Sequence, residues 1–310
     1  VQTLYFNKYL FFFGTNELAT VPQYYNGISS TWGSAGYVWP SSFYPYGGAV
    51  FKNRAYFIGQ SSTKYVYSEL DAITGTTTEV DLGSIISTNA DLYAIKSVSL
   101  SEGIQQENVL AFIFSSGEVL VYSGAYPNSS NWNLIGRFII AGSPLFYNSI
   151  VDARGDSFII SSIGLISLRT LFTQGAEIAT SQAITSPIQN RWKQIAFYYN
   201  QIANGNAALI QGVYDLTNDR LIISFPYDID TDSNPVQGTG LRLIYSFKTQ
   251  SWVEAKIDVS NIANSPYGIG YLAYLNQEVY YTGANNLVVM KVEARASHYD
   301  FGSTPINYRL

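Results

Sequence analysis

Cysteine is absent from this chain of 310 residues, and histidine and methionine each occur once, as His298 and Met290. Without cysteine the protein has no disulfide, no zinc-thiolate site and no thiol nucleophile. A Ser-His-Asp triad or a multi-histidine metal site needs a histidine beside its partners, and nothing in the sequence marks such partners for His298. We therefore expect an exposed or tail histidine and no catalytic residue of these classes.

Charged residues are also scarce. They make up 13% of the chain, with 17 Lys and Arg against 22 Asp and Glu, and the net charge is −5. Globular domains carry about 25% charged residues, so we expect much of this surface to be covered by neighbours. A net negative chain lacks the basic footprint of tight nucleic-acid binding. No apolar run reaches the roughly 20 residues of a membrane-spanning helix, and no P-loop, dinucleotide fingerprint or nucleophile elbow occurs.

Aromatic residues, in contrast, are abundant: the chain has 26 Tyr, 17 Phe and 5 Trp within an apolar content of 47%. Many lie in short runs that alternate with turn residues, which predicts β-strands joined in hairpins. The clearest hairpin spans 109–124, where Gly117 suits the positive φ of a tight turn. Further hairpins are predicted in 157–168 around Gly164, in 209–227 and in 241–257.

The hairpins recur in groups of similar length. The groups lie near residues 10, 55, 110, 158, 209 and 271. Repeats of about 40–50 residues with four strands each are typical of β-propellers. We predict an all-β fold, a single β-propeller of about six blades over residues 1–296, in which strands around 4–13 complete the last blade near 279–292. We expect 297–310 to lead into a further domain, because the chain begins at Val1 and ends in a strand-like run.

One stretch interrupts the strand pattern with a helical period. In residues 173–204, Ser186 is placed to cap a short helix with Pro187 at its first position. Ile188, Trp192 and Ile195 follow at spacings of four and three, which is one face of a helix. The sequence therefore predicts a short helical insertion near 186–196.

A second interruption, residues 22–48, is rich in Gly, Ser, Pro, Tyr and Trp and is interpreted as a long ordered loop. Its aromatic residues suit stacking on sugar rings, the chemistry of a lectin-like propeller. The same residue types are enriched at protein–protein interfaces, and we favour the interface.

The strongest local constellation of polar residues is the run YDIDTDSNP, in which Asp228, Asp230, Asp232 and Asn234 alternate. Oxygen ligands at positions one, three and five of a loop can converge on Ca²⁺. Ser233 stands where a calcium loop needs glycine, so a solvated acidic hairpin tip is the favoured interpretation. A calcium site at these four residues is the alternative, and no other cofactor is predicted.

A glycoside hydrolase would need two carboxylates at a defined separation in space. Glu17, Glu69, Glu118, Asp156 and Glu177 are scattered along the chain, and no pair stands out. An enzyme is therefore not predicted.

The segment 137–192 carries a resemblance to a known family. Glycines and strand residues precede a polar stretch and a helix with isoleucine and tryptophan four residues apart; these residues are Gly155, Asp156, Gly164, Leu165, Ile166, Ile188 and Trp192. In this pattern the segment resembles the tail nozzle and packaged-DNA-stabilisation proteins of short-tailed bacteriophages. The runs SFKTQSWVEAKI and FGSTPINYRL are also similar to that group.

The resemblance implies a structural virion protein of the phage tail or neck, without enzyme activity. It implies a homo-oligomeric ring, a hexamer, that contacts portal, adaptor and tail proteins. Double-stranded DNA would pass through its channel without sequence-specific binding, and the ring would retain the packaged genome until ejection. The alternative is a carbohydrate- or receptor-binding β-propeller of a tail or cell surface.

Overall fold

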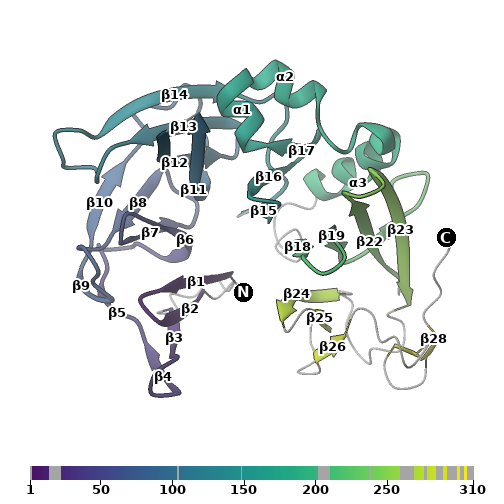
Figure 1. Ribbon diagram of the computed structural model, residues 1–310, viewed down its shortest axis with the longest axis horizontal. Helices are drawn as coiled ribbons and strands as arrows, with labels where there is room; N and C mark the ends of the chain where they lie inside the picture. Colours follow the sequence, from purple (N-terminus) through teal and green to yellow (C-terminus); the bar gives the residue numbers. More distant parts are fainter. Residues whose placement is uncertain are drawn as a thin grey trace. The chain divides into compact units, whose positions relative to one another are not determined.

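The structure is a computed structural model and describes residues 2–13, 22–102, 105–147, 149–201, 210–236, 239–258, 269–275, 278–283, 289–291, 299–300 and 304–305. Nearly all of the regular structure is β, with a small helical part (Figure 1). The chain divides into two compact units: residues 1–148 with 168–179, and residues 149–167 with 180–310. Each unit is built from antiparallel sheets whose strands mostly follow one another along the chain.

The first unit contains three sheets of four strands each. The first sheet has β1 (Gln2–Phe6), β2 (Tyr9–Phe13), β3 (Gln23–Asn26) and β4 (Thr31–Ser34). The second has β6 (Pro45–Phe51), β7 (Arg54–Gly59), β8 (Lys64–Tyr67) and β10 (Thr78–Asp81). The third has β11 (Leu92–Glu102), β12 (Gln105–Phe114), β13 (Glu118–Ser123) and β14 (Asn133–Ile139). A short parallel pair joins β5 (Gly36–Val38) to β9 (Thr74–Thr76).

The second sheet is buried on both of its faces. Successive side chains of a strand point to opposite faces, and all six residues of β7 are buried. Phe57 packs with Phe11 of the first sheet, whereas Tyr56 packs with Phe112 of the third. Complete burial of one such side chain stabilises the fold by about 1.5–3 kcal/mol. The three sheets are therefore stacked face to face in chain order, as blades of a propeller are.

Over its described residues, the second unit contains three sheets of three or four strands and two short strand pairs. One sheet has β15 (Ile150–Ala153), β16 (Asp156–Ser161) and β17 (Gly164–Ser167), and another has β18 (Gln211–Asp215), β19 (Arg220–Phe225), β22 (Thr239–Ser246) and β23 (Ser251–Asp258). The remaining strands are β20 (Asp228–Ile229), β21 (Pro235–Val236), β24 (Ile269–Leu275), β25 (Glu278–Gly283), β26 (Val289–Lys291), β27 (Tyr299–Asp300) and β28 (Thr304–Pro305). The strands β24, β25 and β26 form a three-stranded sheet of their own.

The helical part begins earlier than the sequence predicts. It consists of α1 (Leu168–Gln174), α2 (Ala176–Ser181), the single 3₁₀ turn η1 (Ser186–Ile188) and α3 (Gln189–Gln201). Pro187 lies in the first turn, as expected, but the capping role of Ser186 is wrong. Its hydroxyl donates to the carbonyl of Ala183 and caps no helix N–H, because a 3₁₀ turn precedes α3.

The buried stripe of α3 confirms the predicted helix face. Trp192, Ile195, Ala196 and Tyr199 are buried, a spacing of three and four residues. Trp192 Nε1 donates to the carbonyl oxygen of Ser161 at 2.9 Å, which fixes α3 on the sheet of β16. Tyr199 shares hydrogen bonds with the backbone of Tyr227.

Six consecutive sheets of three or four antiparallel strands are described, and five of them are recognised as propeller blades. The predicted all-β propeller with a helical insertion is thereby confirmed. The hairpin turns predicted in 109–124, 157–168, 209–227 and 241–257 are present. The domain boundary expected after residue 296 stays a prediction.

Two strand predictions are wrong. The strands at 4–13 do not complete the last blade, because they pair with β3 and β4 in a complete first sheet. The segment 22–48 is not a long loop, since it contains β3, β4, β5 and the start of β6. Its strands are only three to seven residues long and lie between turns, so a turn-rich composition concealed them.

Candidate functional site

The first sheet presents aromatic side chains on its exposed face. Its strand register forms one continuous row across the four strands, from Tyr5 through Leu10 and Tyr25 to Trp32. The next row on the same face runs from Thr3 through Phe12 and Gln23 to Ser34. None of these eight residues is charged. We call Tyr5, Phe12, Tyr25 and Trp32 the aromatic face.

Three rings of the aromatic face, those of Phe12, Tyr25 and Trp32, are held in place by one another. The Trp32 ring centroid lies 5.1 Å from that of Phe12 and 5.3 Å from that of Tyr25, at tilted angles. Even so, Trp32 is 65% exposed and Tyr5 is 66% exposed. Beside them, Gln23 Nε2 donates to Ser34 Oγ at 3.1 Å. The result is a fixed, uncharged aromatic surface with hydrogen-bonding groups next to it.

Elsewhere in segment 22–48 most aromatic residues turn inward, although Tyr44 is 45% exposed. Tyr37, Phe43 and Tyr46 are buried, so the sequence was right about exposure only for part of the segment. The Tyr37 hydroxyl donates to the carbonyl oxygen of Ala72 at 2.8 Å, and burial raises its pKa well above the usual value. Phe12 and Tyr5 were missed by sequence reasoning because they lie outside the segment and join it only through strand pairing.

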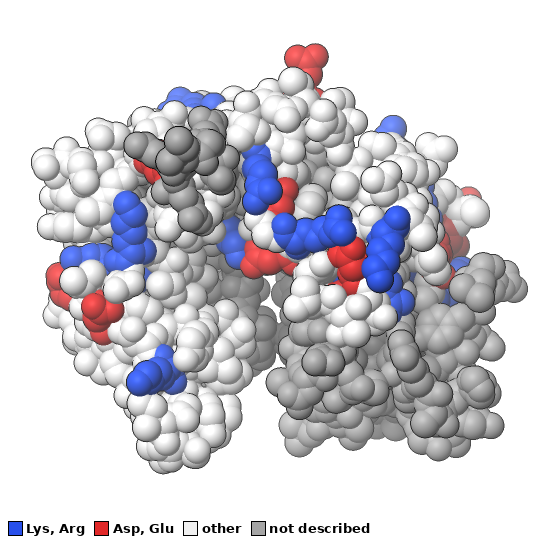
Figure 2. Space-filling view, in the orientation of Figure 1, with Lys and Arg blue, Asp and Glu red and all other residues white. Residues whose placement is uncertain are grey.

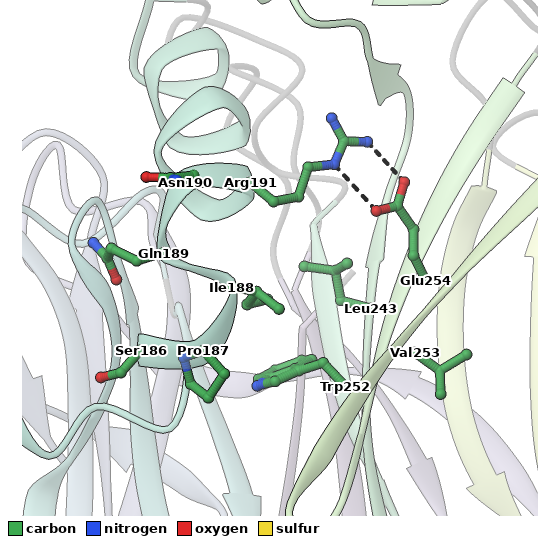
Figure 3. Close-up of a pocket in the computed structure, with 10 residues that line it drawn as sticks. All are labelled: Ser186, Pro187, Ile188, Gln189, Asn190, Arg191, Leu243, Trp252, Val253 and Glu254. Atoms are coloured by element: carbon green, nitrogen blue, oxygen red, sulfur yellow. Dashed lines mark hydrogen bonds and ion pairs between the residues drawn. The ribbon is translucent and has the colours of Figure 1, made fainter. Parts of the chain in front are cut away.

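A second candidate site is a cleft of about 420 Å³ in the second unit, between η1, the first turn of α3 and β23 (Figure 3). Trp252, Glu254 and Lys256 alternate along β23 and therefore point to one face. Trp252 lines the cleft with its indole ring near Pro187 and Ile188. Its Nε1 donates to the carbonyl oxygen of Ile184 at 2.8 Å, which fixes the ring.

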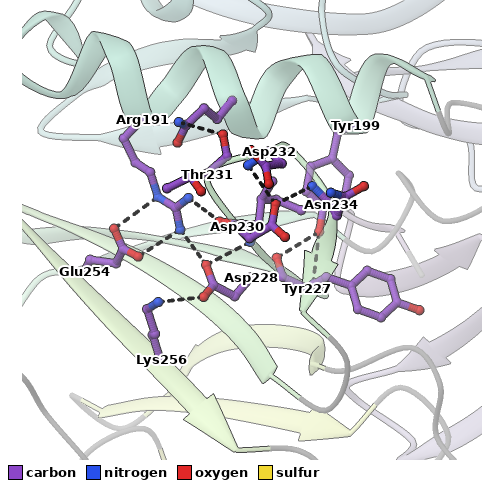
Figure 4. A network of polar contacts seen from close by, with 12 residues as sticks. Arg191, Tyr199, Tyr227, Asp228, Asp230, Thr231, Asp232, Asn234, Glu254 and Lys256 are labelled. Atoms are coloured by element: carbon purple, nitrogen blue, oxygen red, sulfur yellow. Dashed lines mark hydrogen bonds and ion pairs between the residues drawn. The ribbon is translucent and has the colours of Figure 1, made fainter.

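Glu254, at the rim of the cleft, belongs to a network of two acids and two bases (Figure 4). Arg191 donates to both oxygens of Glu254, from Nη2 at 2.9 Å and from Nε at 3.2 Å. The same guanidinium binds the carboxylate of Asp228 and the carbonyl of Ile229. Lys256 Nζ lies 2.8 Å from the other Asp228 oxygen. Asp228 is 1% exposed, and its burial is compensated by these two cations.

One of the predicted calcium ligands, Asp228, belongs to this network. Asp228 directs its carboxylate at Arg191 and Lys256. Asp230 Oδ1 accepts the backbone N–H of Asp232 and of Asn234, so this residue stabilises the hairpin tip. Among the described residues no group of three or more His, Asp or Glu is placed to hold a metal ion. A calcium site at Asp228, Asp230, Asp232 and Asn234 stays a prediction.

The other titratable residues considered in the sequence have local partners or lie outside the described residues. Glu118 accepts the backbone N–H and the hydroxyl of Ser87 and pairs with Arg137. Asp156 accepts the hydroxyl of Ser167, and Glu69 pairs with Arg54. Glu177 lies in α2. Glu17 and His298 fall outside the described residues.

The residues that carry the phage resemblance are structural. Gly164 adopts a φ of +145°, and a Cβ there would lie 2.3 Å from Thr185 Oγ1, which accepts the backbone N–H of Leu165. Together with Trp192 they hold α3 to the sheet of β15, β16 and β17.

Among the described residues seen in Figure 2, uncharged ones make up most of the surface, in keeping with the low charge of the sequence. Over the described residues no helix is both long and apolar enough to cross a membrane. The fold and the two candidate sites together define a β-propeller with an exposed aromatic sheet face and a tryptophan-lined cleft.

No protein-family model matches the chain, and no curated protein matches it. Solved structures do. A protein from Lactobacillus plantarum is 10% identical, with a TM-score of 0.51, and the match covers 93% of this chain and 79% of that one. YCF48 bound to D1 peptide is 11% identical, with coverage of 94% and 81% and a TM-score of 0.48. The WD40 domain of SCAP from fission yeast is 10% identical, with coverage of 92% and 83% and a TM-score of 0.37. At such low identity the likeness concerns the propeller fold alone.

Proposed function

We propose that this chain is a non-enzymatic carbohydrate-binding β-propeller and that the aromatic face of its first sheet is the platform for a glycan chain. The observation that carries the proposal is Trp32, which is 65% exposed although Phe12 and Tyr25 hold its ring at 5.1 and 5.3 Å. Large exposed apolar patches on a protein mark binding surfaces. A rigid exposed indole offers a flat apolar surface without the entropy cost of ordering it on binding.

The chemistry of the surroundings favours a neutral sugar polymer. The row from Tyr5 to Trp32 crosses four strands, which is a span of about 14 Å at the usual strand spacing. That length suits several linked rings more than a single one. The C–H face of each ring would stack on an aromatic residue, and Thr3, Gln23 and Ser34 would contact hydroxyl groups at the side. The absence of charge among the eight residues of the two rows gives an acidic or basic ligand nothing to pair with.

The experiment is a polysaccharide screen by affinity gel electrophoresis, followed by titration of the best ligand. Trp32→Ala is expected to weaken binding by about tenfold, since loss of one stacked aromatic side chain is worth about 1.4 kcal/mol. Tyr44→Ala is the matched control, because Tyr44 is 45% exposed in the same segment but is not part of the face. Absence of binding to every polysaccharide would overturn the proposal. So would an effect of Trp32→Ala on stability alone, which would mean that the face is a packing surface.

The phage tail prediction stays open as a second proposal and has one observation in its favour. Strand β14 is the outer strand of its sheet, and Leu134, Ile135 and Ile139 are 41%, 49% and 59% exposed on it. An apolar strand at the edge of a sheet suits contact between subunits. In this proposal the chain builds a ring, a hexamer, in the tail or neck of a virion and meets portal and adaptor proteins around passing DNA.

Native mass spectrometry tests the ring. A defined oligomer that Ile139→Lys dissociates and Leu216→Lys leaves intact would support it, since Leu216 is 65% exposed in a turn outside that strand. A chain that stays monomeric at high concentration, alone and with neck proteins, would contradict it.

A further inference from the structure

The cleft between η1 and β23 has features that the aromatic face lacks. It is a concave space of about 420 Å³, within the range of small-ligand pockets. Its floor is the Trp252 ring, with Pro187 and Ile188 beside it (Figure 3). The indole Nε1–H is already donated to the Ile184 carbonyl. Trp252 therefore offers a ligand its apolar ring and no polar donor.

At the rim, Glu254 offers acceptors in a fixed position. Each of its oxygens accepts one hydrogen bond from Arg191, and a carboxylate has about four acceptor sites in all. Its side chain is 33% exposed, so part of the carboxylate faces solvent. The exposed amide residue Asn190 lines the same space. The fixed carboxylate therefore supplies acceptors to a small ligand, and Asn190 adds an amide to the lining of the space.

Charge narrows the class of ligand. Arg191 and Lys256 balance Asp228 and Glu254, so the network as a whole is neutral. An anionic ligand would meet the Glu254 carboxylate at the rim, and a cationic ligand would compete with the guanidinium already bound to it. A neutral ligand with hydroxyl groups avoids both costs, because hydroxyls donate to a carboxylate without bringing a charge.

We propose that this cleft is a second site, which binds one neutral pyranose ring. The C–H face of the sugar stacks on Trp252, while its hydroxyls donate to Glu254 and contact Asn190. The ligand class rests on the proposed carbohydrate-binding function, but the site itself uses different residues in the other compact unit. It takes a single ring, whereas the aromatic face takes a chain.

Fluorine NMR of protein labelled with fluorotryptophan tests the site. The chain has five tryptophans, and replacement of each by phenylalanine assigns the resonances. Titration with neutral methyl glycosides is expected to shift the Trp252 resonance in a saturable manner.

Glu254→Gln is expected to weaken the apparent affinity about tenfold, because one charge-assisted hydrogen bond to the ligand is lost. Asn190→Ala provides a second variant at an exposed position, with a smaller loss expected. Phe197→Ala, 57% exposed elsewhere on α3, is expected to leave the affinity unchanged.

The two carbohydrate proposals fail separately. A saturable Trp252 shift that persists in Trp32→Ala supports the cleft even where polysaccharide binding at the aromatic face is absent. A Trp252 resonance that does not shift with any neutral glycoside overturns the cleft proposal, whether or not a polysaccharide binds at Trp32. A shift that is equal in wild type, Glu254→Gln and Asn190→Ala also overturns it, because the ligand then does not use the rim. A stronger response to a uronic acid than to its neutral parent sugar contradicts the proposed class.

Discussion

The indole Nε1 of Trp192 donates a hydrogen bond of 2.9 Å to the carbonyl oxygen of Ser161, with both residues fully buried. This bond joins the helical insertion to a β-sheet over 31 positions of sequence. The same helix then supplies Arg191 to the acid–base network beside the cleft. The position of the cleft therefore depends on how α3 is attached.

Trp192→Phe is expected to destabilise the protein by about 1–3 kcal/mol, because the buried Ser161 carbonyl loses this donor. Chemical denaturation followed by circular dichroism measures the loss. Phe197→Ala is the control on the same helix and should change stability by less than about 0.5 kcal/mol, since its side chain is 57% exposed. Equal effects of the two variants would contradict this account of the helix.

Gly164→Ala is expected to cost about 1–3 kcal/mol, because its φ of +145° is strained for any side chain and the new Cβ would meet Thr185 Oγ1 at 2.3 Å. Gly175→Ala separates the two causes. Gly175 has a φ of +89° with nothing within 4 Å of a Cβ, so only the backbone strain remains and the loss is expected to be smaller. Thermal melts of both variants give the comparison.

Asp228→Asn is expected to lower stability by about 1.5–3 kcal/mol, because it removes the charged acceptor of Arg191 and Lys256 in a buried position. Lys256→Gln should cost less than about 1 kcal/mol, since the lysine side chain is 59% exposed. Denaturant titration of both variants measures the two losses of stability. A larger loss for Lys256→Gln than for Asp228→Asn would show that the lysine contributes most of the stability of the network.

Removal of calcium is expected to leave the melting temperature unchanged. To ligate a metal ion, Asp228 would have to leave two cations and Asp230 would have to release two backbone amides. Melts with EDTA and with added calcium decide the matter. A rise in melting temperature with calcium that is lost in Asp230→Asn would establish the site that the sequence pattern suggested.

Alkaline pH is expected to destabilise the fold through its buried tyrosines. Burial raises the pKa of Tyr56 and Tyr65 well above the ordinary 10.0, with smaller contributions from neighbouring groups. An acid whose pKa is raised by folding keeps its proton longer in the folded state, so stability is lost as pH rises above the unfolded value of 10.0. Tyrosinate absorbance should show a fraction that ionises only as the chain unfolds. Smooth titration of all tyrosines before unfolding would contradict this.

Much of the fold could be predicted because most strands pair with their neighbours in the sequence. The turn at Gly117, with a φ of +87°, and the turn at Gly164 lie between strands that pair with their sequence neighbours. A repeated hairpin pattern is therefore visible in the residues themselves. The short strands β3 and β4 were missed because each has only four residues in a turn-rich segment, and β5 was missed because its partner strand, β9, lies far along the chain.

The candidate sites were harder to predict. Tyr25 and Trp32 stood out by residue type, but Tyr5 and Phe12 join them only through the strand register. The alternation of Trp252, Glu254 and Lys256 in one strand was visible, whereas Arg191 lies 63 positions away from Glu254. No sequence spacing relates two groups at that separation.

The sequence by itself determined the class of the fold, because composition, turn residues and a period of two are properties of neighbouring residues. It also determined that the protein has no cysteine chemistry and a low charge. The tertiary structure decided which aromatic residues are exposed: Tyr37 and Trp32 lie five residues apart, yet one is 6% and the other 65% exposed. Alternation specifies that two faces exist, and only the packing of another sheet decides which of them is covered.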